Sequence, residues 1–234
     1  MDEKTNHELA ILFSNYPDLK ICREGILDAF RLLNNCYRQS GLIMVCGNGG
    51  SAADAEHIVG ELMKGFKMKR PVKPEQRSMI SSLFPADGEY LANNLQQAIP
   101  AISLVSQTSI STAFANDVNA EMVFAQLVFG YGKPDDVLIG LSTTGNSANV
   151  VNACKIAKAL GIHTIAFTGE KESRLSEICD VTIQVPACEV YRVQELHQPV
   201  YHALCAMLEI DAFGGLAVSD DLPLPPPKGD INGK

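Results

Sequence analysis

Two turns rich in glycine and hydroxyl groups are the parts of this sequence best suited to bind an anion. Residues 47–51 read Gly-Asn-Gly-Gly-Ser, residues 142–147 read Ser-Thr-Thr-Gly-Asn-Ser, and a helical pattern follows each turn. Glycines let backbone N–H groups approach an anion closely, and the helix dipole favours negative charge at that point. For either turn alone, a tight turn and an ordinary serine N-cap explain the residues equally well. The two turns together favour a phosphate site.

A nucleotide is a less favoured ligand for the first turn. Gly47, Gly49 and Ala52 satisfy a loose dinucleotide-binding pattern, but residues 67–70 are basic where that pattern expects a strand ending in an acidic residue. Neither turn is followed by Gly-Lys-Ser or Gly-Lys-Thr, so the sequence does not support a triphosphate-binding loop of the Walker type.

Titratable residues follow the first turn and recur near the C-terminus. His57 and Glu61 stand four residues apart, so their side chains share one helix face, where they can bind a metal ion or move protons. An isolated pair with this spacing is more often an exposed surface pair. Gln194 and His202 belong to a polar cluster that runs into an apolar helix. Taken alone, His202 would be a hydrogen-bonded core histidine.

The composition limits the function further. At 234 residues, with 46% apolar residues, the chain is long enough to bury a sizeable core. A net charge of -8 argues against gripping a nucleic acid backbone, so nucleic acid is not an expected partner. Seven scattered cysteines without a CxxC pair indicate reduced thiols and a cytoplasmic protein. No apolar run approaches the roughly 20 residues of a membrane span.

The elements that would position these residues alternate along the chain. Short apolar runs predict five strands buried on both faces, at residues 42–46, 101–105, 137–141, 164–167 and 181–185. Helical patterns separate or follow them, at residues 52–66, 120–129, 148–160, 173–178 and 200–210. This alternation predicts an α/β fold, a three-layer αβα sandwich around a five-stranded parallel sheet. Both turns then lie at the carboxyl ends of strands, where such sheets bind ligands.

Three segments do not fit the regular alternation. Residues 1–40 predict two helices broken near residues 15–17, and the second carries an apolar stripe over residues 19–36 that needs a partner. Residues 41–213 form the main domain, with an insertion at about residues 71–100 that carries one helix over residues 89–99. The proline-rich tail, residues 214–234, is expected to be disordered.

Four motifs, in this order, resemble the phosphoheptose isomerase branch of the SIS (sugar isomerase) family. They are CGNGGSAADAEHIVGEL at 46–62, Asn116-Asp117, LSTTGNSANV at 141–150 and RVQELHQPVYH at 192–202, and the resemblance covers about residues 40–210. It implies a flavodoxin-like SIS fold and an aldose-ketose isomerase that interconverts sedoheptulose 7-phosphate and an aldoheptose 7-phosphate through an enediol(ate). It also implies a homotetramer with N-terminal oligomerisation helices at its core, which would bury the stripe at 19–36.

The resemblance implies roles for individual residues. The substrate pocket would be lined by Asn48, Gly49, Gly50 and Ser51, with Asn116 and Asp117 on substrate hydroxyls and Glu61 and Gln194 also in contact with the sugar. The phosphate would be held by Ser142, Thr143, Thr144 and Ser147. The family's zinc-binding set corresponds to His57, Glu61, Gln194 and His202. We expect Glu61 to move the proton between C1 and C2, His202 to handle the oxygen proton, and zinc to polarise the carbonyl.

Three features depart from the family's pattern. Pro199 predicts a break in the helix between Gln194 and His202, and even a straight helix would separate the two by about 12 Å. The basic residue that the family places shortly after the position of Glu61 is replaced by Lys64-Gly65-Phe66-Lys67. The insertion at 71–100 exceeds the usual connection and lies beside the expected pocket, where it would alter the choice of sugar.

Two other functions compete with the isomerase. One is a non-catalytic SIS tetramer that serves as a protein-binding platform, of the type that associates with replication initiators; the presence of Glu61 and His202 favours catalysis instead. The other is a sugar-phosphate-sensing regulator, but residues 1–40 are too short and too acidic at their start for a helix-turn-helix domain.

Overall fold

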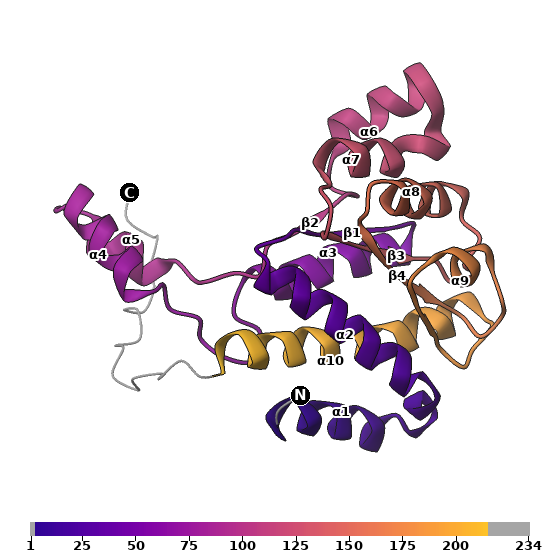
Figure 1. Cartoon of the computed structure of the whole chain (residues 1–234), viewed down its shortest axis with the longest axis horizontal. Coiled ribbons are helices and arrows are strands. Elements are labelled where there is room, and N and C mark those ends of the chain that lie inside the picture. The colour runs from indigo at the N-terminus through magenta and orange to yellow at the C-terminus, as the bar shows by residue number, and fades with distance from the viewer. Residues whose placement is uncertain (1–2, 215–234) are drawn as a thin grey trace, which may run out of the picture.

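A five-stranded, all-parallel sheet forms the centre of the molecule (Figure 1). The computed structural model describes residues 3–214. The strands lie in the order β2-β1-β3-β4-β5 and comprise β1 (Ile43–Gly47), β2 (Ala101–Ser103), β3 (Val137–Leu141), β4 (His163–Thr168) and β5 (Val181–Gln184). The register pairs Ile43 of β1 with Ala101 on one side and Val137 on the other. The predicted α/β fold is confirmed, and the strand order is that of flavodoxin-like sheets.

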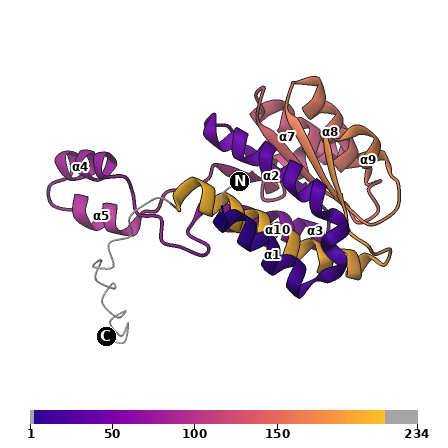
Figure 2. The ribbon, with the colours of Figure 1, turned by 60° about the horizontal axis from the view of Figure 1, so that its bottom comes forward.

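Alternate residues of each strand point into two separate apolar cores. Ile43 and Val45 pack on the side of α2 (Arg23–Arg38), α3 (Gly50–Met63) and α10 (Val190–Phe213). Met44 and Cys46 pack on the side of α7 (Val123–Tyr131), α8 (Ala148–Ala159) and α9 (Arg174–Ile178). Figure 2 shows these two helix layers on opposite faces of the sheet. Because both faces are covered, the strands read as continuous apolar runs.

The N-terminal helices belong to the fold of the subunit itself. The predicted break lies between α1 (Glu3–Asn15) and α2, where the 3-10 helix η1 (Pro17–Cys22) connects them, and α1 packs against α10. Most of the apolar stripe at 19–36 is covered by its own chain: Ile26, Phe30 and Leu33 are buried in the core, whereas Ile21 is 78% exposed. The expectation that assembly buries this stripe is therefore wrong for all but Ile21, because the sheet supplies its partner.

Pro199 does not break the C-terminal helix. α10 runs without interruption from Val190 to Phe213, so it begins about ten residues earlier than the predicted helix at 200–210. Proline leaves the carbonyl four residues earlier, that of Glu195, without its helical donor. Glu195 and Pro199 both line a solvent-accessible cavity, where water can satisfy that carbonyl.

The insertion holds two short helices where the sequence predicted one. α4 (Pro74–Leu83) and α5 (Gly88–Asn94) pack against each other and extend away from the sheet, as Figures 1 and 2 both show. The helix predicted at 89–99 ends at Asn94, well before Pro100. We call residues 73–95 the arm.

A second helical segment, not predicted as such, follows β2 and comprises α6 (Thr108–Phe114), the π-helix η2 (Ala115–Asn119) and the 3-10 helix η3 (Ala120–Met122).

A buried ion pair fixes the arm to the body. The Arg70 guanidinium and the Glu209 carboxylate are fully buried side chains, with Nε and Oε1 2.7 Å apart. Arg70 also donates to the backbone carbonyls of Glu61 and Leu62, at the end of α3. Glu209 accepts two further bonds, from the backbone N–H groups of Phe66 and Lys67. The pair thus joins the entrance of the arm to both α3 and α10.

Membrane spans, cysteines and the C-terminal tail complete the description of the chain. No helix within residues 3–214 is long and apolar enough to cross a membrane. All seven cysteines are free thiols. Apart from Gly214, which caps α10, the tail predicted at 214–234 lies outside the described residues.

Replacing Glu209 by leucine should lower the free energy of unfolding by about 3–5 kcal/mol, because it leaves the Arg70 cation buried without its counter-ion. The matched control is Asp211→Ala, which removes the partner of the exposed Arg38 from the same helix and should cost at most about 1 kcal/mol. Denaturant unfolding of both variants measures the difference. Equal costs would contradict the role assigned to the buried pair.

Candidate functional site

The two turns predicted to bind an anion lie side by side at the carboxyl edge of the sheet. They follow β1 and β3, which are neighbouring strands. Asn48 of the first turn and Asn149 of α8 exchange two hydrogen bonds through their side-chain amides, with N···O distances of 2.8 and 2.9 Å. Strand order and this amide pair therefore combine the two turns into one surface.

The first turn brings bare backbone to the start of α3. Gly49 has a φ of 55°, which favours glycine, and it caps the helix without a side-chain bond. A Cβ on Gly50 would lie 2.6 Å from Nε2 of Gln194, so the end of this flexible side chain occupies the space that glycine leaves. Ser51 is buried beside them. Gln194 therefore lies against the first turn.

In the second turn, the hydroxyls bind one another and do not cap the helix. Ser142 Oγ and Ser147 Oγ are 3.0 Å apart, and Ser147 makes no side-chain cap bond to α8. Gly145 has a φ of 67°, and a Cβ there would lie 2.0 Å from Ser173 Oγ. Thr143 and Ser147 are partly exposed and Thr144 is exposed. The start of α8 would thus offer an anion its backbone N–H groups and two hydroxyl-bearing side chains.

Three of the predicted titratable residues meet between α3 and α10. His57 Nε2 lies 3.2 Å from Glu61 Oε1 on α3 and 3.4 Å from His202 Nε2 on α10. Glu61 Oε2 pairs with Lys64 at 2.8 Å. The sequence predicted His57 and Glu61 on one face, and only the packing of α10 along α3 brings His202 to them. The seven residues from Gly50 to His57 place this cluster about 10 Å along the helix from the first turn.

Sequence reasoning missed two members of the cluster, Asp54 and Tyr201. The Tyr201 hydroxyl lies 3.1 Å from Asp54 Oδ1 and 3.1 Å from His57 Nδ1. Since Asp54 precedes His57 by one helical turn and Tyr201 adjoins His202, their positions in the sequence were the available signal. The contact orients the His57 ring, so that its other nitrogen faces Glu61 and His202.

Burial and neighbouring charges shift the pKa values of Glu61, His202 and Asp54. Burial acts to raise the pKa of Glu61, but the Lys64 ammonium and His57 outweigh it, so that pKa is lowered. Burial, with a contribution from His57, lowers the pKa of His202. Burial raises the pKa of Asp54, although the Tyr201 hydroxyl opposes that rise. At neutral pH, Glu61 is therefore a carboxylate and His202 a neutral imidazole.

The expected zinc ligands are only partly assembled. In tetrahedral zinc sites with Zn–N bonds of 2.0–2.1 Å, neighbouring ligand atoms lie about 3.3 Å apart, which matches the two separations around His57 Nε2. Among residues 3–214, however, no three His, Cys, Asp or Glu side chains form a group that could hold an ion as they stand. The Gln194 amide lies at the start of α3, against Gly50. The side chains fit zinc in donor type and in two separations, but not as a completed set.

The remaining predicted residues, Asn116 and Asp117, are not joined to the cluster. They lie on η2, are exposed, and bind each other through Nδ2 and Oδ1 at 2.8 Å. No hydrogen bond within residues 3–214 links them to either turn or to His57. The α6–η2 segment rises from the sheet (Figure 1).

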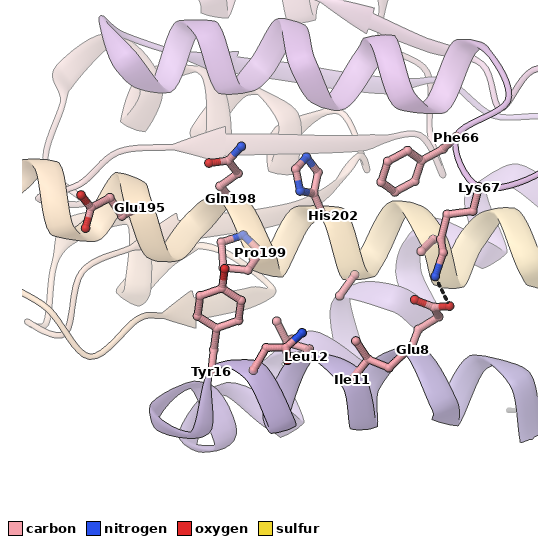
Figure 3. A pocket seen from close by; sticks show the side chains of 13 residues that line it. Glu8, Ile11, Leu12, Tyr16, Phe66, Lys67, Glu195, Gln198, Pro199 and His202 are labelled. Atoms are coloured by element: carbon pink, nitrogen blue, oxygen red, sulfur yellow. Dashed lines mark hydrogen bonds and ion pairs between the residues drawn. The ribbon is translucent and has the colours of Figure 1, made fainter.

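A cavity opens on the other side of His202. It has a volume of about 590 Å³ and lies between α1 and α10 (Figure 3). Leu12 of α1, Tyr16 directly after that helix, Pro199 of α10 and Phe66 line it together with His202. None of its lining residues belongs to the two turns, so the cavity meets the cluster at His202 and is separate from the turns.

Comparison of the sequence with known proteins identifies a family. The SIS domain family model matches residues 20–82 and 91–169, which leaves the turn of the arm outside it. A phosphoheptose isomerase of Akkermansia muciniphila is 33% identical over 215 residues, covering 92% of this chain and all of that protein. One of Nitratiruptor is 40% identical over 167 residues, covering 71% of this chain and 75% of that protein.

Solved structures give the same result. The phosphoheptose isomerase of Neisseria gonorrhoeae superposes with a TM-score of 0.66 at 31% identity, covering 88% of this chain and 97% of that one. The phosphoheptose isomerase of Francisella tularensis gives a TM-score of 0.67 at 26% identity, covering 86% and 96%. Sequence and fold agree: this chain belongs to the SIS domain family and, within it, resembles the phosphoheptose isomerases.

Proposed function

We propose that this protein is an aldose-ketose isomerase that acts on a sugar phosphate, and that its substrate is sedoheptulose 7-phosphate. One observation carries the proposal: a carboxylate and an imidazole meet His57 at the interface of α3 and α10, about 10 Å along α3 from two joined anion-binding turns. A phosphate held by the turns would present the sugar carbons to these two side chains. The similarity to phosphoheptose isomerases supports the seven-carbon sugar.

In the proposed reaction, Glu61 removes a proton from the carbon next to the carbonyl and returns it to the neighbouring carbon. Its lowered pKa keeps it ionised and therefore able to accept that proton. His202, neutral at pH 7, donates a proton to the carbonyl oxygen and takes one from the adjacent hydroxyl, so the enediol(ate) forms and collapses without net change in protons. Each Glu61 oxygen already has one partner, His57 or Lys64, and keeps a second lone pair for the substrate.

The two turns would hold the phosphate without a cation. The glycine backbone of residues 47–50 and the hydroxyls of Thr143 and Ser147 surround the start of two helices, α3 and α8, whose dipoles favour an anion. Asn48 and Asn149 keep the turns in register. Asn116 and Asp117 would contact substrate hydroxyls only after a movement of η2 or from a neighbouring subunit of the proposed homotetramer.

Zinc is the proposed cofactor, held by His57, Glu61 and His202, with Gln194 as a fourth ligand after its amide moves from Gly50. A zinc ion at this position would polarise the carbonyl oxygen. Tyr201 would fix the His57 ring in the orientation that presents Nε2 to the ion.

Glu61→Gln should abolish isomerisation and the exchange of substrate hydrogen with solvent deuterium, because the amide cannot accept the carbon-bound proton. The measurement is NMR of five- to seven-carbon sugar phosphates in deuterated water. Glu56→Gln, on an exposed position of the same helix, is the control and should retain both activities. Exchange at the wild-type rate in Glu61→Gln would remove Glu61 from this role. Absence of turnover by the wild-type protein on the whole panel would favour the binding-platform function.

Lys64→Met should move the acid limb of the pH profile of kcat to higher pH. Lys64 lowers the pKa of Glu61, so its removal raises that pKa, and the carboxylate is then protonated at a higher pH than in the wild type. Steady-state rates between pH 4 and pH 9, roughly the range that spans carboxylate and imidazole titration, test this. Lys67→Met, which removes the partner of Glu8, is the control and should leave the limb in place. An unchanged limb in Lys64→Met would mean that Glu61 does not set it.

His57→Gln should lower the zinc content of protein dialysed against zinc from about one ion per chain to near zero, because it removes the central donor of the cluster. Elemental analysis and calorimetric zinc titration measure this without reference to activity. His163→Gln, at the opposite end of the sheet on β4, should bind zinc as the wild type does. Equal zinc binding by the wild type and His57→Gln would exclude this site.

A further inference from the structure

The arm exposes apolar side chains that the rest of the chain does not cover. On α4 and the turn after it, Met79, Leu83 and Phe84 are 63%, 67% and 55% exposed, and on the return Tyr90 and Leu95 are 70% and 51% exposed. α4 buries no residue at all. A patch of this kind marks an interaction surface rather than scattered surface hydrophobics.

The arm is too small to hold its shape through its own contacts. Its helices have 10 and 7 residues, and isolated helices of this length are marginal in water. Within residues 3–214, α4 and α5 have each other as their principal packing partner. A partner that covers the exposed side chains would supply the missing burial.

The root of the arm is nevertheless firmly held. Arg70 is fully buried, Pro71 and Gln96 form an antiparallel bridge, and the Gln97 amide donates to the carbonyl of Pro71. The backbone N–H of Ile99 donates to the carbonyl of Leu62 on α3. The arm is therefore held out from the body and does not fold back over the body to bury its apolar face.

Charge divides along the arm. The root of the arm, residues 69–77, is basic: it contains Lys69, Lys73 and Arg77 and one acid, Glu75. Residues 78–94 contain no cation and carry Asp87 and Glu89 at the turn. None of these charges forms an ion pair with another described residue. Two such arms placed antiparallel, by a two-fold axis, bring each basic root against the acidic turn of the other.

We propose that the arm is a self-complementary docking surface whose occupant is the arm of a second copy of this chain. Leu83 and Phe84 lie at the centre of the contact, and the root and turn charges set its antiparallel direction. This contact is distinct from the cavity between α1 and α10, and it does not depend on the isomerase proposal.

The first test measures association of the full-length chain by sedimentation velocity over a range of concentrations. Leu83→Ser combined with Phe84→Ser should raise the dissociation constant of the assembly at least about tenfold, because two large apolar side chains are no longer buried. Phe129→Ser, which removes an aromatic of similar exposure from α7, is the matched control and should leave that constant unchanged. Unchanged association of the arm variant, or a wild-type chain that is monomeric at all concentrations, would overturn the proposal.

The second test uses charge. Lys73→Glu with Arg77→Glu makes an all-acidic arm, and Asp87→Lys with Glu89→Lys makes an arm without exposed acids at its turn. Each variant alone should associate about fivefold more weakly or worse, because like charges then meet at both ends. An equimolar mixture of the two should restore association, since each root then faces a turn of opposite charge. Failure of the mixture to recover would exclude the arm-to-arm contact in favour of docking on another surface.

Discussion

The packing of α10 along α3 is the constraint on which the candidate site depends. Gln194 lies against Gly50, Tyr201 and His202 against His57, and Glu209 reaches the end of α3 through Arg70. The two helices therefore run in the same direction, and their contacts are fixed at the start, middle and end of α3. A shift of one helix past the other by a single turn, about 5.4 Å, would separate all three contacts at once.

Glycine leaves room for a close side-chain contact in each of the two turns. At Gly50 the neighbouring side chain fills the place of a Cβ, and at Gly145 the Ser173 hydroxyl does the same. The two positions lie in the two turns proposed to bind the phosphate, so the glycines there admit a neighbouring side chain as well as giving access to the backbone.

The fold followed from the sequence more directly than the site did. The five strands were predicted to within a few residues, because runs covered on both faces have no polar interruption, and Val137–Leu141 was predicted without error. Pro199 misled the prediction because its cost depends on whether water reaches the Glu195 carbonyl, which no local pattern reveals. The meeting of His202 with His57 depends on how two helices distant in sequence pack, and only the resemblance to a known family suggested it. The resemblance assigned Gln194 and Gly50 to the same pocket, but the direct contact of the two was not foreseen from the sequence.

The Arg70 guanidinium has a mechanical consequence for the chain. This cation, at the root of the arm, donates both to the Glu209 carboxylate of α10 and to the backbone carbonyl of Glu61, the candidate base. A force applied to the arm is therefore transmitted, through one rigid planar group, to the final turn of the helix that carries the base. The root of the arm, which carries the proposed assembly contact, is thus coupled through one side chain to the helix that carries the candidate site.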